Sequence, residues 1–145
     1  KMFKVEAEAV RRLLDRFQHR ILDFSAPKIN RVFILIDRED LKEVVRFLVS
    51  EGFMHLSAIT ALNAGDSIEI LYHFNGGSIL ATLRVKLPQN DYIIPTITDL
   101  IPGAMLHERE AHDLFGIRFE GNPDLRPLIL PEDWPAGIYP LRKKD

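Results

Sequence analysis

Alternation of hydrophobic and polar positions in the middle of the chain predicts three consecutive β-strands. Residues 67–74, "SIEILYHF", and residues 78–87, "SILATLRVKL", place their large apolar side chains on one face, with Arg84 and Lys86 on the other. The apolar positions are Ile68, Ile70, Tyr72, Phe74, Ile79, Ala81, Leu83, Val85 and Leu87. Residues 53–63 form the preceding strand, and turn sequences at 64–66 and 75–77 separate the three. One apolar and one polar face is typical of antiparallel strands, so we expect a meander here.

Helical periodicity appears on both sides of this meander. Apolar residues over 6–22 recur at helical spacing and predict a first amphipathic helix, with a stripe of Val10, Leu13, Leu14, Phe17, Ile21 and Phe24. Residues 31–37, "RVFILID", predict a buried strand, and residues 37–52 predict a second helix capped by Asp37 and ended by Gly52. Residues 98–116 predict a short helix, a break at Pro102–Gly103 and a helix ending at Gly116. The expected fold class is α+β, a mostly antiparallel sheet covered by helices.

The last 25 residues have a different composition. Residues 121–145 hold five of the nine prolines, which argues against a regular helix or a central strand. They also carry many large apolar side chains, which a disordered linker lacks. From the residues alone, this segment is either a tail folded over its own domain or an arm laid on another protein. We therefore predict a globular α+β domain over 1–120 and an extended, Pro-rich C-terminal arm over 121–145, which is a docking arm under the second of these two interpretations.

Composition excludes several classes of function. The 145 residues carry a net charge of −2, which gives no reason to expect nucleic acid or anionic lipid as a partner. There is no cysteine, so the chain offers no disulfide, no thiolate nucleophile and no thiolate ligand for an iron–sulfur cluster. The longest run of large apolar residues, 32–36, is far shorter than the ~20 residues that span a bilayer. No secretory signal pattern opens the sequence, and its start at Lys1–Met2 leaves the native N-terminus open.

The stretch "HEREAHDLFG", residues 107–116, has the composition of a metal or acid–base site but not its spacing. His107 and His112 are five residues apart, which separates them by roughly 140° around a helix. Only Glu108 and His112 are spaced to meet, and two ligands are fewer than a zinc site needs. A charged helix that faces solvent or a partner is the preferred interpretation. On it, Ala104, Ala111 and Phe115 form a narrow apolar seam.

A family resemblance covers residues 32–145. Residues 108–135, "EREAHDLFGIRFEGNPDLRPLILPEDWP", with "YPLRKKD" after them, closely resemble the signature of the hydrophilic 30-kDa subunit of respiratory complex I (NADH dehydrogenase). The family includes counterparts in archaeal complex I-like dehydrogenases and energy-converting membrane-bound nickel–iron hydrogenases. Upstream, "EDLKEVVRFL", "GFMHLSAITALNAGDSIEILYHF" and "IIPTITDLIPGA" look like the same family. Two residues depart from its pattern: Asn122 stands where histidine is usual, and His112 stands where tyrosine is frequent.

The resemblance implies a structural role without catalytic residues of its own. It implies a non-catalytic structural and assembly subunit of the peripheral arm of a respiratory electron-transport complex, peripheral to the membrane on its cytoplasmic face. The expected partners are the large hydrogenase-like subunit and the small iron–sulfur subunit. This chain is expected to bind no cofactor or metal; iron–sulfur clusters, and flavin or nickel–iron where present, belong to the partners. The electron donor (NADH, F420H2, ferredoxin or formate) and the acceptor (quinone, phenazine or protons) stay open.

The signature then indicates interface chemistry. Arg109 is placed to pair with Asp113 at i+4 or with a partner carboxylate, and Trp134 is a candidate anchor or a core residue. The predicted interface comprises Glu108, Arg109, Glu110, Asp113, Phe115, Gly116, Gly121, Pro123, Asp124, Leu125, Arg126, Pro131, Glu132, Asp133, Trp134, Pro140, Leu141 and Arg142. Two alternatives are a stand-alone metal-dependent hydrolase using His107, Glu108 and His112, and a free adaptor that captures peptides.

Overall fold

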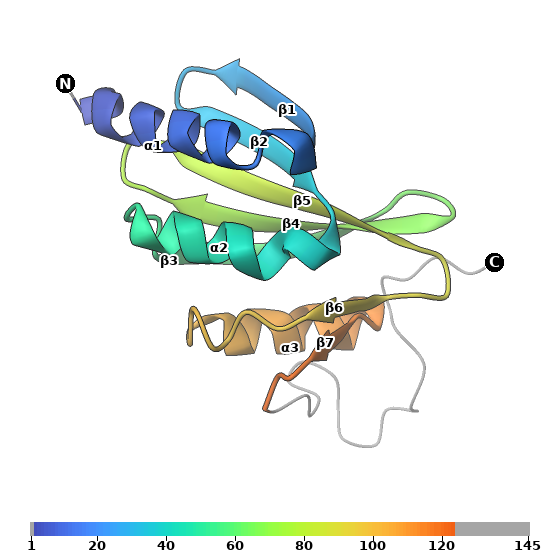
Figure 1. Ribbon diagram of the computed structural model, residues 1–145. Coiled ribbons are helices and arrows are strands. Elements are labelled where there is room, and N and C mark those ends of the chain that lie inside the picture. Colours follow the sequence, from blue (N-terminus) through green and yellow to red (C-terminus); the bar gives the residue numbers. More distant parts are fainter. Residues whose placement is uncertain (1, 124–145) are drawn as a thin grey trace.

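The computed structural model describes the backbone of residues 2–123 and the side chains from residue 7 onward. In chain order the elements are α1 (Met2–Arg16), η1 (Gln18–Arg20), β1 (Ile21–Lys28), β2 (Arg31–Ile36), η2 (Arg38–Asp40), α2 (Leu41–Ser50), β3 (His55–Asn63), β4 (Ser67–Asn75), β5 (Leu80–Pro88), β6 (Ile93–Pro95), α3 (Ala104–Phe115) and β7 (Arg118–Glu120). Figure 1 shows them as a layer of helices beside a sheet, with β6, β7 and α3 beyond the β3 edge. Within residues 2–123, no helix is both long and apolar enough to cross a membrane.

The main sheet has five strands in the order β1-β2-β5-β4-β3. Strands β3, β4 and β5 form the predicted antiparallel meander, and β1 pairs antiparallel with β2. Strand β2 pairs with β5 in parallel, across the helix and strands that separate them in sequence. A second sheet contains the parallel pair β6 and β7. The predicted α+β class with a mostly antiparallel sheet is confirmed.

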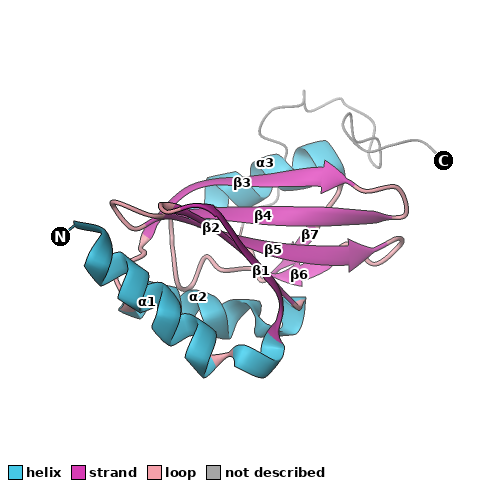
Figure 2. Cartoon of the chain, turned by 90° about the horizontal axis from the view of Figure 1, so that it is seen from above, coloured by secondary structure: helices cyan, strands magenta, loops and turns pink. Residues whose placement is uncertain are grey.

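One face of the main sheet forms the core. The predicted apolar positions of β4 and β5 are all at most 2% exposed, from Ile68 through Phe74 and from Ile79 through Leu87. Helices α1 and α2 cover this face (Figure 2), where the Phe17 and Phe47 rings meet edge to face with centroids 5.8 Å apart. Burying each large apolar side chain contributes roughly 1.5–3 kcal/mol, so this face supplies most of the driving force for folding.

Two predictions for the first 30 residues are wrong. Helix α1 ends at Arg16 rather than at residue 22, and residues 21–28 form strand β1 instead. Leu22 and Phe24, predicted as helix positions, lie on this edge strand and are 56% and 38% exposed. Pro27 lies where the β1–β2 register shifts, the position in an edge strand where a missing N–H is tolerated.

The ends of α2 and α3 were predicted correctly, whereas the predicted cap at the start of α2 was not. Gly52 and Gly116 follow α2 and α3 with φ of 97° and 75°, as expected for residues that end a helix. Asp37 makes no side-chain capping bond and instead precedes the short helix η2. The short helix predicted before Pro102 is a single turn, closed by the Ile101 N–H donating to the Ile97 carbonyl at 2.8 Å.

Ion pairs and hydrogen bonds join η2 and α2 to β6 and to the residues on either side of it. The Arg38 guanidinium donates to the carbonyls of Asp91 and Ile93 at 3.0 and 2.9 Å and also pairs with the Asp91 carboxylate. Lys42 pairs with Asp99 at 2.7 Å in the loop that leads to α3. Exposed ion pairs contribute little to stability individually. These contacts lie on both sides of β6, in the segment that leads to the candidate site.

Candidate functional site

Helix α3 carries the residues singled out from the sequence, and it packs beside the edge strand β3. Ala111 and Phe115 are buried, and with Ile59 and Ala61 they line a groove of about 270 Å³ between α3 and β3. Ile59 and Ala61 face the same side of the sheet as Tyr72 and Ile70, their β4 neighbours. Helix α3 therefore extends the layer formed by α1 and α2 toward the β3 edge.

Glu108 is fully buried at the centre of α3. The Thr96 hydroxyl donates to its Oε1 at 2.6 Å, and the Asn122 side-chain amide donates to the same oxygen at 2.8 Å. The Ile97 backbone N–H donates to Oε2 at 2.9 Å. One carboxylate therefore joins α3 to the loop after β6 and to the chain that leaves β7.

The electrostatics of this carboxylate are set by opposing effects. Burial raises the pKa of Glu108, and the hydrogen bonds from Thr96, Ile97 and Asn122 lower it by less. Tyr72, also fully buried, has a hydroxyl with no hydrogen-bond partner. Burial and the charge of Glu108 raise the pKa of Tyr72 well above its ordinary value. Tyr72 is therefore a neutral phenol at any physiological pH.

The root of the C-terminal segment, residues 121–122, folds back toward α3. The Thr96 N–H donates to the Glu120 carbonyl at 2.8 Å, and the Asn122 N–H donates to the Phe119 carbonyl at 3.2 Å. Gly121 has φ of 93°, and a Cβ there would lie 2.9 Å from the Thr96 methyl group. The turn that brings Asn122 to Glu108 thus requires glycine.

The structure places the predicted interface residues in two groups. Glu108, Asp113 and Phe115 are buried within the domain, whereas Glu110, Gly121 and Pro123 are exposed and Arg109 and Gly116 are partly exposed. The expectation that Glu108 lies on the surface is therefore wrong: it occupies the apolar seam between Ala104 and Ala111. Ten predicted residues lie outside the described part of the chain: Asp124, Leu125, Arg126, Pro131, Glu132, Asp133, Trp134, Pro140, Leu141 and Arg142.

The two histidines of α3, His107 and His112, lie in different environments. A ring nitrogen of His112, Nδ1, lies 2.9 Å from the Ile117 carbonyl and bonds the turn that ends the helix. His107 lines a different, largely apolar pocket of about 460 Å³ with Met54, His55 and Leu100. No group of three or more metal-ligating side chains occurs within residues 7–123. With Glu108 held by internal bonds, this geometry does not favour a hydrolase built on His107, Glu108 and His112.

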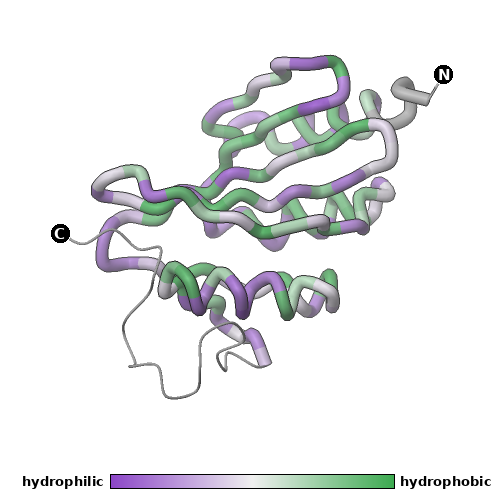
Figure 3. The backbone as a smooth tube through the Cα atoms, turned by 180° about the vertical axis from the view of Figure 1, so that it is seen from behind, coloured by the Kyte–Doolittle hydropathy of each residue, from purple (hydrophilic) through white to green (hydrophobic). Residues whose placement is uncertain are grey.

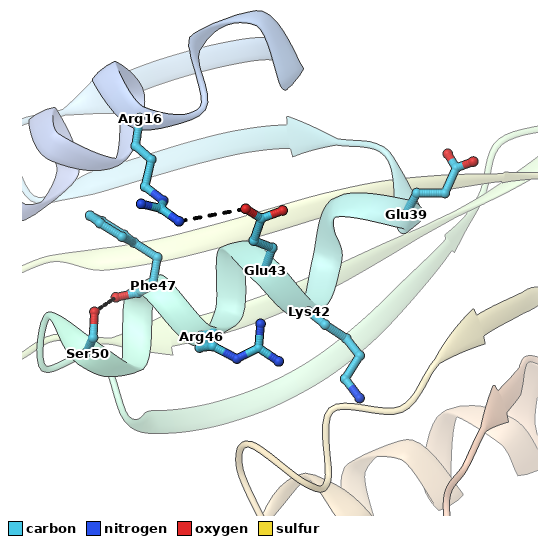
Figure 4. A pocket seen from close by; sticks show the side chains of 7 residues that line it. All are labelled: Arg16, Glu39, Lys42, Glu43, Arg46, Phe47 and Ser50. Atoms are coloured by element: carbon cyan, nitrogen blue, oxygen red, sulfur yellow. Dashed lines mark hydrogen bonds and ion pairs between the residues drawn. The ribbon is translucent and has the colours of Figure 1, made fainter.

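A pocket on α1 and α2, which the sequence did not predict, is larger than the α3–β3 groove and the His107 pocket. It has a volume of about 680 Å³ and is lined by Arg16, Glu39, Lys42, Glu43, Arg46, Phe47 and Ser50 (Figure 4). Glu43 accepts from Arg20 at 2.7 Å and pairs with Arg16 at 3.7 Å, and Arg20 lowers its pKa. The Ser50 hydroxyl donates to the Phe47 carbonyl at 2.6 Å. The Arg16–Glu43 pair joins α1 to α2. None of these contacts forms an activated nucleophile or an acid–base pair.

The opposite face of the sheet, which is turned toward the viewer in Figure 3, carries polar side chains that bond to one another. His73 lies between Thr60 and Thr82, with each ring nitrogen 3.0 Å from a threonine hydroxyl. Burial, and then the nearby Arg31, lower the pKa of His73. Arg84 donates to both carboxylate oxygens of Glu69, at 2.6 and 3.1 Å. These polar groups are therefore paired with one another, and threonine hydroxyls engage both ring nitrogens of His73.

The sequence of residues 34–145 matches the profile of a known family, described as the 30-kDa subunit of respiratory-chain NADH dehydrogenase. The chain belongs to this family. The match covers most of the globular domain and the whole segment after β7, so the 30-kDa subunit resemblance of the sequence is confirmed.

Relatives of this 30-kDa family member come from three kinds of complex. Over 77% of the chain it is 36% identical to the beta subunit of the membrane-bound hydrogenase of Pyrococcus furiosus, covering 68% of that protein. Over 90% of the chain it is 30% identical to a subunit of the F(420)H(2) dehydrogenase of Methanosarcina mazei, covering 85% of it. Over 93% of the chain it is 33% identical to a subunit of the NADH-quinone oxidoreductase of Trichlorobacter lovleyi, covering 86% of it.

Solved structures show the same fold. The trypsin-resistant fragment (1-134) of Nqo5 matches with a TM-score of 0.70 and 28% identity, covering 81% of this chain and 99% of that one. A chain of the membrane-bound sulfane sulfur reductase, an archaeal respiratory membrane complex, matches with a TM-score of 0.83. That match covers 94% of this chain and 83% of the other, and at 24% identity it shows the fold alone.

Proposed function

We propose that the chain is a non-catalytic structural and assembly subunit in the peripheral arm of a membrane-associated, complex I-like oxidoreductase. One observation carries this proposal: relatives named for three different activities share this chain over most of its length. A hydrogenase, an F420H2 dehydrogenase and an NADH–quinone oxidoreductase differ in electron donor or acceptor. The subunit common to the three complexes therefore serves their assembly and does not determine which electron donor or acceptor they use.

The chemistry of the described residues supports a role without catalysis. Glu108 is hydrogen-bonded on both oxygens, Tyr72 is held neutral in the core, and His73 lies between two threonines. A general acid or base needs a group within reach of a substrate. Glu108 and Tyr72 are fully buried, and threonine hydroxyls engage both ring nitrogens of His73. We propose that the chain binds no cofactor or metal, and that iron–sulfur clusters belong to its partners.

The partners we propose are the large hydrogenase-like subunit and the small iron–sulfur subunit of the same complex. The exposed side of α3, with Arg109 and Glu110, and the segment from Gly121 onward would form the contact. Arginine forks and apolar anchors are the groups that dominate binding energy at protein interfaces. We place the protein on the cytoplasmic face of the membrane, held there through these partners.

Affinity purification tests the proposal. The tagged full-length chain, purified from detergent-solubilised membranes of its native host, should carry along iron-containing subunits that mass spectrometry identifies as the large and small subunits. The matched control is the chain ended at Pro123, which should keep the melting temperature of the full chain and lose these partners. Retention of the partners by the shortened chain would move the docking role to α3. Full-length chain purified without any iron-containing protein would contradict the proposed function.

A further inference from the structure

The contact between Asn122 and Glu108 lies where the globular domain passes into the segment that follows it. Asn122 is partly exposed and comes from the chain after β7, whereas Glu108 is fully buried in α3. Their hydrogen bond, 2.8 Å from Nδ2 to Oε1, spans 14 residues of sequence. The same oxygen accepts from Thr96, whose N–H already binds β7 at the Glu120 carbonyl. Helix, loop and segment root therefore meet at one carboxylate oxygen.

We propose that Glu108 and Asn122 form an anchor that fixes the direction in which the C-terminal segment leaves the domain. In this anchor Glu108 is the fixed half, because α3 and the Ile97 N–H hold it inside the protein. Asn122 is the half that comes from the segment, and Gly121 supplies the turn that Asn122 needs. Where the segment docks on partner subunits, as in the proposed function, the anchor sets the starting point and heading of that contact.

Physical chemistry gives the anchor its strength. A hydrogen bond to an ionised carboxylate is stronger than one between neutral groups, and it strengthens in surroundings that exclude water. Among residues 7–123, the charged or titratable groups that interact with Glu108 from neighbouring elements are Tyr72 of β4 and Asp99 of the preceding loop. Neither is a cation that would compete with Asn122 for the carboxylate. Holding the root before docking reduces the conformational entropy that the segment loses on binding.

A distance measurement on the full-length chain tests the anchor without any partner. The chain has no cysteine, so Lys86→Cys on the exposed side of β5 and Pro123→Cys next to the anchor accept two spin labels selectively. Pulsed electron–electron double resonance then measures the distribution of distances between the spin labels at positions 86 and 123. The labelled parent chain is compared with Asn122→Ala, Asn122→Asp and the matched control Asn30→Ala, which changes an exposed asparagine in the turn between β1 and β2.

The anchor predicts a specific set of outcomes. The parent chain and Asn30→Ala should give one narrow distribution, and Asn122→Ala should lose it while its circular-dichroism spectrum remains that of the folded parent. Asn122→Asp places a second carboxyl against Glu108, and two carboxyls at one site ionise together only at a high cost. Its distribution should therefore be broad at neutral pH and narrow again in acid, where the pair shares a proton.

Other results would overturn the anchor. A narrow distribution in Asn122→Ala would show that β7 and Gly121 alone fix the root. A broad distribution in Asn122→Asp at every pH would show that no proton-sharing contact with Glu108 exists. Failure of the proposed function has a different signature, because an intact distance distribution with no iron-containing partner in the purification would remove the docking role and leave the anchor standing.

Discussion

Replacing Glu108 with alanine should destabilise the isolated domain, which the charged appearance of α3 does not suggest. The change removes the acceptor of the buried Ile97 N–H and of the Thr96 hydroxyl. An orphaned buried donor costs about 1–3 kcal/mol. The Thr96 hydroxyl lies 2.9 Å from that of Thr98, so it has a replacement partner. Relief of a buried charge works in the opposite direction, and we expect a net loss of about 1–3 kcal/mol at neutral pH.

Urea unfolding followed by circular dichroism measures this loss. The free energy of unfolding falls linearly with urea concentration, so a shift in midpoint at constant slope gives the change in stability. Glu110→Ala is the matched control, since Glu110 is an exposed glutamate on the same helix and its loss should stay within about 0.5 kcal/mol. Equal midpoints for the two variants would refute the reasoning, because Glu108 would then contribute no more than a solvated surface charge.

Three further predictions follow from other features of the core. Burial raises the pKa of Glu108 above its ordinary value of 4.5. The pH-dependent part of its contribution to stability is therefore fully present below that value and is lost as pH rises through the raised pKa, whereas the hydrogen bonds to the carboxylate remain. Glu108→Gln should remove this slope from urea midpoints measured across pH. Tyr72→Phe removes a buried hydroxyl that has no hydrogen-bond partner, so the free energy of unfolding in urea should equal or exceed that of the parent. A decrease of more than about 1 kcal/mol in this free energy would mean that the hydroxyl is hydrogen-bonded. Gly76→Ala places a Cβ 2.3 Å from the buried Phe53 ring and should cost about 1–3 kcal/mol in urea unfolding, whereas Gly103→Ala, which meets nothing within 4 Å, serves as its control.

The parts of the fold that the sequence predicted are those with a local periodic signal. The β3–β4–β5 meander has one face against helices and one face with polar groups, and such strands alternate strictly. Strand β1 lacks this signal because it is an edge strand whose residues after Ile21 are all exposed. Its Ile21 and Phe24 continue the helical spacing of α1 by coincidence, which extended the predicted helix too far. The parallel pairing of β2 with β5 joins residues about 50 apart, and no local pattern encodes it.

The buried position of Glu108 did have a signal in the sequence. Ala104, Ala111 and Phe115 define the apolar seam of α3, and position 108 falls on the same stripe, four residues after the first and three before the second. A charged residue is rarely buried without partners, so its type outweighed its position. The partners come from two segments on either side of α3, Thr96–Ile97 and Asn122, which the pairing of β6 with β7 brings together. A polar residue on the apolar stripe of a predicted helix is therefore a candidate for a buried side chain that hydrogen-bonds to several segments.

The distribution of polar contacts also bears on how such a protein attains specificity. On the open face of the sheet, Arg84 binds Glu69, and His73 binds two threonines. Groups that are already paired offer little to a partner, because a new contact must first break an existing one. In the proposed function, specific recognition therefore falls to the outer side of α3 and to the segment from Gly121 onward, which we propose as the docking surfaces. The relatives are named for three different electron-transfer activities. Under the proposed function, the domain keeps one fold across these complexes, and the sequence of the proposed docking segment is free to differ from one partner to the next.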